Sequence, residues 1–191
     1  MIDITIIDNA LPLSLADDLE NIINNGTYPW FFVSDITYGN NIGNNMGEGE
    51  VIIPGHQHIY FDSEHGGILS NNFGYIHSIP HIIFDKIGYK KRPQIIRAKS
   101  FMHLPLIKPQ EYLHDNLHID FTFPHIVCLY YVNDTDGDTF IYDIDKKLKR
   151  ISPKKNRAVI FDGSLYHASS LPTKHKRVII NINLAYDIVV D

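Results

Sequence analysis

The chain has 191 residues, a formal net charge of −5 and a hydrophobic content of 44%. This length allows one domain with a sizeable core, and the mean hydropathy of −0.13 is typical of a globular protein. The negative charge argues against nucleic-acid binding through phosphate contacts, and no apolar run is long enough to span a membrane. We therefore expect a single domain over residues 1–191 that binds neither nucleic acid nor membrane.

The cysteine usage and the start of the chain bear on its location. Cys128 is the one cysteine, so an internal disulfide is excluded, and its apolar neighbours predict a buried, inert thiol. The first residues lack the basic segment that begins a signal peptide. Both observations predict a cytoplasmic location.

The first elements, within a support region over residues 1–95, are a strand and a helix. Residues 1–8 alternate apolar and polar side chains, which predicts a strand. A helix should follow Pro12, with Ser14 as its N-cap and Gly26 as its end.

The rest of the support region is aromatic and then glycine-rich. Residues 28–38 predict a strand whose Trp30-Phe31-Phe32 cluster packs in the core, or in part lines a substrate groove. Residues 39–49 are rich in Gly and Asn and predict a loop, and a second helix is expected near residues 73–87.

From residue 96 to residue 191, short predicted strands alternate with turns. Helices followed by many short antiparallel strands predict a mainly β fold with flanking helices (α+β). We expect a double-stranded β-helix, the cupin-like jelly roll, with the helices packed on one sheet. Small folds of this type enclose one ligand.

His118 and Asp120 are the first candidate site residues. They alternate with apolar neighbours in residues 117–121, so on a strand both side chains point to one face. His167 follows a strand-like segment, 157–161, and a turn. Two imidazoles and one carboxylate form a ligand set typical of non-haem Fe(II) with open coordination positions.

Arg177 begins the last strong predicted strand, ten residues after His167. An arginine in a half-apolar strand is costly to bury unless an anion meets it, and its planar fork suits a carboxylate. One face of this strand is apolar and the other carries the polar residues: Val178, Ile180, Ile182 and Leu184 on the first, Arg177, Ile179, Asn181 and Asn183 on the second.

Several stretches between residues 96 and 188, with the lead-in 6–11, match one known family. They are 117–120, 128–133, 137–140, 152–161, 166–168 and 176–177. In them the chain resembles the Fe(II)- and 2-oxoglutarate-dependent dioxygenases of the prolyl 4-hydroxylase type. The resemblance implies that His118, Asp120 and His167 bind iron, that Arg177 binds the far carboxylate of 2-oxoglutarate, and that Tyr131 hydrogen-bonds the same carboxylate.

The resemblance also implies an activity. It predicts that the enzyme uses O2 and 2-oxoglutarate, hydroxylates a protein side chain (prolyl-type) or a small metabolite, and releases succinate and CO2. It implies no catalytic side chain beyond the metal ligands, and it leaves room for ascorbate as a further cofactor. Asp120 argues against halogenation, which needs that ligand position for halide.

Two departures from the family pattern concern loops. Asp138 follows Gly137 where the family has a second glycine, and the segment 101–118 is longer than usual. His103, Tyr112 and Asn181 are candidates for the substrate side of the site. His114-Asp115 lies beside the iron motif, but its residues are adjacent and so do not share a strand face.

A histidine pair and a basic hairpin each allow a structural and a functional interpretation. His56 and His58 share the i, i+2 spacing of a metal pair but lack a nearby carboxylate. The basic hairpin 146–157 fits either a solvated edge protected by charge or a site for an anionic partner.

Two other classes of protein stay open on the sequence. A non-oxidative cupin-like protein would bind a metal or a small acid without turnover. A structural or interaction domain would carry its histidines by accident. Arg177 favours the oxygenase, because a protein that only binds metal does not need it.

Overall fold

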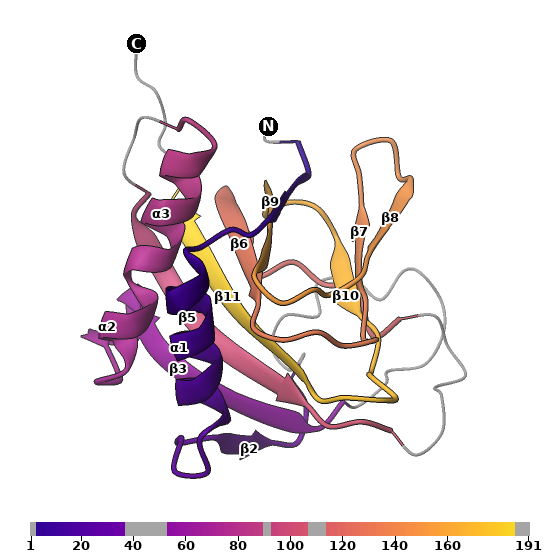
Figure 1. Cartoon of the computed structure of the whole chain (residues 1–191). Helices are drawn as coiled ribbons and strands as arrows, with labels where there is room; N and C mark the ends of the chain where they lie inside the picture. Colours follow the sequence, from indigo (N-terminus) through magenta and orange to yellow (C-terminus); the bar gives the residue numbers. More distant parts are fainter. Residues whose placement is uncertain (1–2, 37–52, 90–92, 107–113, 186–191) are drawn as a thin grey trace.

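The computed structural model describes residues 3–36, 53–89, 93–106 and 114–185. These residues form two antiparallel sheets and three α-helices (Figure 1). The main sheet has eight strands, with β1-β9-β6-β11-β5-β3-β2 in order and β4 beside β3; the minor sheet is β10-β7-β8. The bounds in the main sheet are β1 Thr5–Asp8, β2 Phe31–Val33, β3 Gly55–Asp62, β4 Gly67–Ile68, β5 Ile95–His103, β6 His125–Tyr131, β9 Arg157–Asp162 and β11 Arg177–Ala185; those in the minor sheet are β7 Thr139–Tyr142, β8 Leu148–Ile151 and β10 His167–Ser169.

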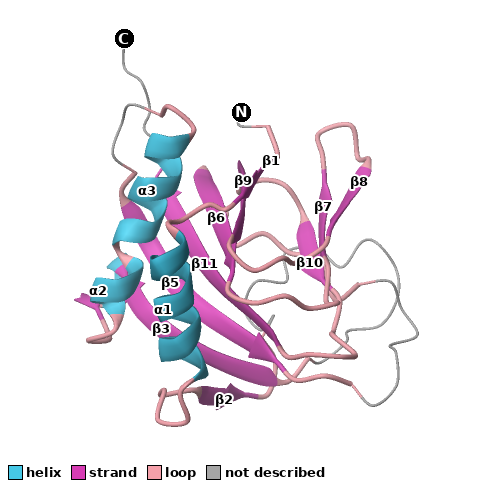
Figure 2. Cartoon of the chain, viewed as in Figure 1, coloured by secondary structure: helices cyan, strands magenta, loops and turns pink. Residues whose placement is uncertain are grey.

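The helices lie together on one face of the main sheet, and the minor sheet lies on its other side (Figures 1 and 2). They are α1 (Leu13–Asn24), α2 (Phe73–Ile76) and α3 (Ser78–Lys86). The predicted mainly β architecture with helices on one sheet is confirmed, and the two facing sheets fit the expected jelly roll. Strands β1 to β4, from the N-terminal half, extend the same main sheet.

Alternation along the strands divides the apolar side chains into two cores. On β11, Val178, Ile180 and Ile182 join the core beneath the helices, whereas Ile179 joins the core between the two sheets. Residues on neighbouring strands divide in the same way, because successive side chains point to opposite faces. The predicted division of this strand into an apolar and a polar face is confirmed.

The predicted helix ends need correction. Pro12, not Ser14, is the N-cap of α1, and Ser14 lies inside the first turn. The expected helix near residues 73–87 is two helices separated at His77. Pro80 explains the break, because a proline has no N–H to donate to the carbonyl of Ile76 in a continuous helix.

The Trp30-Phe31-Phe32 cluster was expected in the core, and for two of its rings this is wrong. Phe31 is 61% and Phe32 68% exposed, and Trp30 is half-buried. Both phenylalanines lie on β2, a three-residue strand that pairs with β3 at the edge of the sheet. At this edge position no layer formed by the described residues covers the two rings. The predicted loop 39–49 lies outside the described residues.

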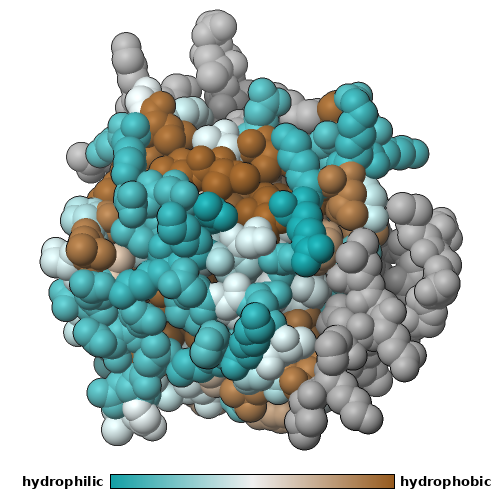
Figure 3. Space-filling model, turned by 45° about the vertical axis from the view of Figure 1, so that its right-hand side comes forward, coloured by the Kyte–Doolittle hydropathy of each residue, from teal (hydrophilic) through white to brown (hydrophobic). Residues whose placement is uncertain are grey.

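The surface is mostly hydrophilic on the face drawn in Figure 3, where hydrophobic residues gather in a band across its upper part. Cys128 is buried, as predicted, and burial raises its pKa to about 12. Among the described residues, no helix has the length and apolar character that crossing a membrane requires.

Candidate functional site

His118, Asp120 and His167 come together at the mouth of the space between the two sheets. His118 and His167 are paired across antiparallel backbone segments, and the N–H of each donates to the carbonyl of the other at 3.0 Å. One ligand atom from each of the three residues lies within 4.8 Å of the others. Among the described residues, His118, Asp120 and His167 are the one group of three or more His, Cys, Asp or Glu side chains close enough to hold a metal ion.

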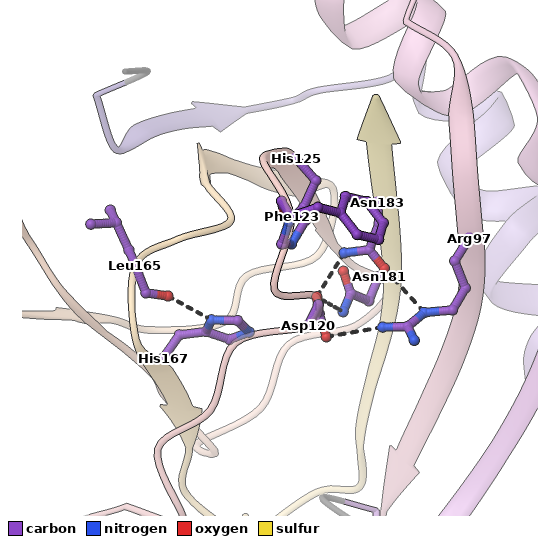
Figure 4. A network of polar contacts seen from close by, with 8 residues as sticks. All are labelled: Arg97, Asp120, Phe123, His125, Leu165, His167, Asn181 and Asn183. Atoms are coloured by element: carbon purple, nitrogen blue, oxygen red, sulfur yellow. Dashed lines mark hydrogen bonds and ion pairs between the residues drawn. The ribbon is translucent and has the colours of Figure 1, made fainter. Parts of the chain in front are cut away.

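Backbone carbonyls fix the orientation of both imidazoles. The Nδ1 atom of His167 lies 3.0 Å from the carbonyl oxygen of Leu165 (Figure 4). The Nδ1 atom of His118 lies 3.2 Å from the carbonyl oxygen of Asn116. A carbonyl only accepts, so Nδ1 carries the hydrogen in each bond. Each Nε2 then keeps a lone pair for a metal, which is the arrangement that metal-binding histidines usually show.

Asp120 is held by three donors from two strands. Asn181 and Asn183 of β11 donate to Oδ2 at 2.9 and 2.7 Å, and Arg97 of β5 donates to Oδ1 at 3.3 Å (Figure 4). Burial alone would raise the pKa of this carboxyl, but His167, at low pH where its ring is protonated, and the guanidinium of Arg97 lower that pKa well below its ordinary value. Asp120 is therefore an oriented carboxylate, ready to act as a ligand.

His167 is kept neutral by its surroundings. Burial, together with the neighbouring His118, lowers its pKa to about 4. A neutral imidazole is the form that binds a metal, so no proton has to leave at neutral pH. His125 is also buried nearby, but it lies against Gly163 and does not belong to the three-ligand group (Figure 4).

A single cavity extends from the metal ligands to Arg177. The polar face of β11 lines the cavity at both of these ends. Asn181 lies at the metal end, where it contacts Asp120, and Arg177 lies four residues before Asn181 along the strand. Four residues of strand span about 13 Å. The cavity therefore offers a metal position at one end and a buried cation at the other.

Arg177 is 2% exposed and oriented by two acceptors. Its Nε donates to the carbonyl of Gly137 at 2.9 Å, and its Nη2 donates to Thr139 Oγ1 at 2.9 Å. The hydroxyl of Tyr131 donates to the same Thr139 oxygen at 2.7 Å. Since that oxygen accepts twice, the hydroxyl hydrogen of Thr139 is left to donate into the cavity. Tyr131 thus acts on the cavity through Thr139, which the sequence interpretation missed.

Gly137, which matches the family pattern, and Asp138, which departs from it, both have structural explanations. A Cβ on Gly137 would lie 2.8 Å from both Arg177 Cδ and the carbonyl of Ser170, so a side chain here would displace the arginine. Asp138 forms an ion pair with Arg150 of the basic hairpin, and its N–H donates to Ser170 at 2.9 Å. The hairpin keeps its shape with an aspartate in this position.

The three substrate-side candidates have different outcomes. Asn181 contacts Asp120, so it orients a ligand. His103 is 1% exposed and is paired across β5 and β11 with Arg177, which places it at the arginine end of the cavity. Within the described part of the chain neither of its ring nitrogens has a hydrogen-bond partner, and burial with the charge of Arg177 lowers its pKa to about 3. Tyr112 lies outside the described residues.

Two cavity residues, Arg97 and Lys99, were not singled out from the sequence, and Asp115 was considered there only as a neighbour of the iron motif. Arg97 and Lys99 alternate with apolar residues in β5, a pattern that could have indicated a polar face. Asp115 could not have been assigned in this way, because it precedes the iron motif on an irregular segment. Its Oδ2 accepts from Ser169 at 3.1 Å, and burial raises its pKa to about 7.

The two other sequence features are structural. Both ring nitrogens of His58 are hydrogen-bonded, to the carbonyl of Pro29 and to Ser70, so His58 has no free nitrogen for a metal. Cations of the hairpin 146–157 form ion pairs within the molecule: Lys147 with Asp145, Arg150 with Asp138, Lys154 and Arg157 with Asp8, and Lys155 with Asp17 and Glu20. These pairs favour the solvated-edge interpretation.

Solved structures share this arrangement of sheets and helices. A 2OG-Fe(II) oxygenase family oxidoreductase from Burkholderia pseudomallei aligns with a TM-score of 0.68 and 10% identity, over 95% of this chain and 84% of that one. The chain has the fold of the 2OG-Fe(II) oxygenases. A Pseudomonas putida prolyl-4-hydroxylase aligns at a TM-score of 0.56 and 12% identity, over 96% and 92% of the two chains. A Trichoplax adhaerens prolyl hydroxylase in complex with a hypoxia inducible factor peptide aligns at 0.58 and 17%, over 95% and 82%.

The sequence comparisons give no match of this kind. No family model matches the chain, and no curated protein matches it. The likeness to the 2OG-Fe(II) oxygenases is thus one of fold, and it extends over nearly the whole chain.

Proposed function

We propose that the protein is an Fe(II)- and 2-oxoglutarate-dependent oxygenase. One observation carries the proposal: three oriented ligands and a buried arginine open into the same cavity. The ligand set fits Fe(II), because two neutral imidazoles and one carboxylate leave coordination positions open for other molecules. The arginine fits a dicarboxylate that reaches from the metal to the far end of the cavity.

The side chains bind and orient in this proposal. His118, Asp120 and His167 would hold the iron, with Asp120 kept in place by Asn181, Asn183 and Arg97. Arg177 and Thr139 would hold the far carboxylate of 2-oxoglutarate, and their hydrogen bonds to Gly137 and Tyr131 set their direction beforehand. Such preorganisation lowers the cost of binding the co-substrate in a reactive position.

The neutral His103 lies beside Arg177 with two unpaired ring nitrogens among the described residues. One nitrogen of a neutral imidazole donates and the other accepts. We place His103 beside the bound co-substrate, where it can donate a hydrogen bond without adding charge.

Iron, 2-oxoglutarate and O2 supply the oxidative chemistry together. One oxygen atom enters a C–H bond of the substrate, and the other enters succinate as 2-oxoglutarate loses CO2. The substrate would be a protein side chain (prolyl-type) or a small metabolite. A requirement for ascorbate and a cytoplasmic location stay predictions.

The test is an anaerobic titration of the Fe(II)-loaded protein with 2-oxoglutarate. A metal-to-ligand charge-transfer band in visible light forms when the keto acid chelates the iron, so it reports both groups without knowledge of the substrate. We expect the band in the wild type and none in His118→Ala. In Arg177→Gln the band should need more 2-oxoglutarate while Fe(II) affinity is unchanged.

The other outcomes are equally clear. Fe(II) binding without a band would favour the non-oxidative cupin-like protein. No Fe(II) binding would make the three-residue motif an accident. An Arg177→Gln variant with unchanged 2-oxoglutarate affinity would contradict the role given to that arginine.

A further inference from the structure

Lys99 is a third cation in the cavity, in addition to Arg97 and Arg177, and the proposed reaction has not used it. It lies on β5 on the same face as Arg97 and Phe101, and it is in register with Asn181 of β11. Its ammonium is 5.9 Å from the centre of the Phe101 ring. The side chain is half-buried and lines the cavity that contains the metal ligands.

The charge of Lys99 has no counter-ion in the described part of the chain. No carboxylate there lies within ion-pair distance of its ammonium, although Asp120 and Asp62 are close enough to influence it. Asp120 is engaged by Arg97 and by the two asparagines, and Asp62 by His65. Burial and the neighbouring Arg97 together lower the pKa of Lys99 to about 8.

An ammonium in this position weakens the fold unless an anion meets it. Removal from water disfavours the charged form, and the positive charge of Arg97 adds repulsion. A bound metal ion would add more positive charge to the same region. A cation held under these conditions inside a cavity is typical of a binding site.

The co-substrate does not account for this cation. Its far carboxylate is assigned to Arg177, which pairs with His103 at the other end of β5. Lys99 lies four residues from His103 along that strand, a span of about 13 Å. The near carboxylate of 2-oxoglutarate binds the metal itself in the proposed reaction. The carboxylates of the described residues and those of the co-substrate therefore leave this cation without an anion, and the substrate is a molecule that can bring one.

We propose that Lys99 binds a carboxylate of the substrate, so that the enzyme oxidises a carboxylic acid at a carbon a few bonds from that group. This proposal rests on the proposed function, because it assumes that the iron and 2-oxoglutarate fill the rest of the cavity. The short distance follows from the register, since Lys99 is opposite Asn181, which contacts the metal ligand Asp120. A free acid and the side chain of an aspartate or glutamate share this chemistry.

The test uses acetate as the simplest carboxylate and acetamide as its neutral match. Both are titrated into the anaerobic Fe(II)–2-oxoglutarate complex, and binding is measured from the paramagnetic broadening of their methyl proton signals. We expect acetate to bind at least tenfold more tightly than acetamide in the wild type. Lys99→Met should abolish this preference, whereas Lys99→Arg should keep it.

The controls separate a binding role from a structural one. Lys149→Met removes a lysine from the exposed strand β8 and should leave acetate binding unchanged. The concentration of 2-oxoglutarate that gives half the charge-transfer band should change less than threefold in Lys99→Met. A loss of 2-oxoglutarate binding in that variant would overturn the proposal, because Lys99 would then serve the co-substrate.

The remaining outcomes also decide the question. The proposal is wrong if the wild type binds acetate no better than acetamide, or if Lys99→Met binds acetate as the wild type does. If no charge-transfer band forms, the proposed function fails first, and the acetate preference is then measured on the metal-free protein by saturation-transfer NMR. If Lys99→Met does not fold, Lys99→Arg still tests the proposal. The arginine variant keeps the positive charge, so it should still bind acetate more tightly than acetamide.

A second arm distinguishes the two sources of carboxylate. Free amino acids are compared with aspartate and glutamate blocked at both backbone ends, and succinate release is measured for each. Stimulation by free acids alone assigns a small-molecule substrate. Stimulation by the blocked residues assigns an acidic side chain in a protein. Stimulation of succinate release only by neutral prolyl peptides would contradict the proposal that the substrate carries a carboxylate.

Discussion

The two faces of the main sheet differ in composition although they are built from the same strands. Toward the helices, β11 presents Val178, Ile180 and Ile182, which pack in a continuous apolar core. Toward the minor sheet it presents Arg177 and Asn181 among few apolar residues, and these line the cavity. One face therefore packs the core and the other lines the candidate binding cavity, and successive residues of the strand alternate between them.

This difference separates the effects that mutations should have. A substitution on the helix side removes packing and acts on the free energy of unfolding. A substitution on the cavity side removes an oriented polar contact and acts on the affinity for a metal or an acid. Four predictions test the separation.

The largest effect on stability is expected for Ile182→Ala. Ile182 is fully buried on the helix side, and the cavity left by its side chain should lower the free energy of unfolding by about 2–5 kcal/mol. The matched change Ile179→Ala, on the face that already borders the cavity, should cost clearly less. Denaturant unfolding of the metal-free proteins measures both. Equal losses would contradict the distinction between the faces.

Asn183→Ala should weaken metal binding while sparing the fold. Asn183 donates to Asp120 at 2.7 Å, and loss of such a partner typically lowers metal affinity about 10–100-fold. Competition with a coloured chelator measures Fe(II) affinity, and thermal unfolding of the metal-free protein serves as the control. An unchanged affinity would mean that Asn181 and Arg97 are sufficient to orient the carboxylate.

Gly137→Ala should lower the affinity for 2-oxoglutarate, at the Arg177 end of the cavity, without changing the affinity for Fe(II). The new Cβ would collide with Arg177 Cδ and move the guanidinium, so 2-oxoglutarate affinity should fall about tenfold or more. Fe(II) affinity should stay at the wild-type level, since the metal ligands lie at the other end of the cavity. Titration of the charge-transfer band gives the first value and chelator competition the second. Parallel losses of both would indicate a general disturbance of the fold.

The smallest effect is a change in pH dependence in Asp115→Asn. Burial raises the pKa of Asp115 to about 7 in the folded protein, against an ordinary value of 3.8. Between these values the folded state holds a proton that the unfolded state has lost, so stability falls as the pH rises from about 4 to about 7. The asparagine variant lacks this fall and should gain at least about 1 kcal/mol over the wild type at pH 8 relative to pH 4. Thermal unfolding of the metal-free proteins at both pH values measures it, and parallel curves would contradict the raised pKa.

The three candidate metal ligands and the arginine could be singled out from the sequence because their evidence is local. The spacing of two residues predicted that His118 and Asp120 share one face of a strand; the structure has an isolated bridge at His118 in place of that strand, but the two side chains still come together. Alternation in β11 separates Arg177 from its apolar neighbours. The Trp30-Phe31-Phe32 cluster could not be placed in this way. An aromatic strand has the same sequence at the edge of a sheet as at its centre, and only the strand order decides its exposure.

The sequence by itself determined the residue types of the site, their faces on each strand and the mainly β architecture, because all three follow from short-range periodicity and residue chemistry. Only the tertiary structure decided which distant residues meet. The contact of Arg97 with Asp120 depends on strand pairing across β5 and β11, and the position of His103 beside Arg177 depends on the same register. Register is a property of two segments together, so neither segment alone contains it.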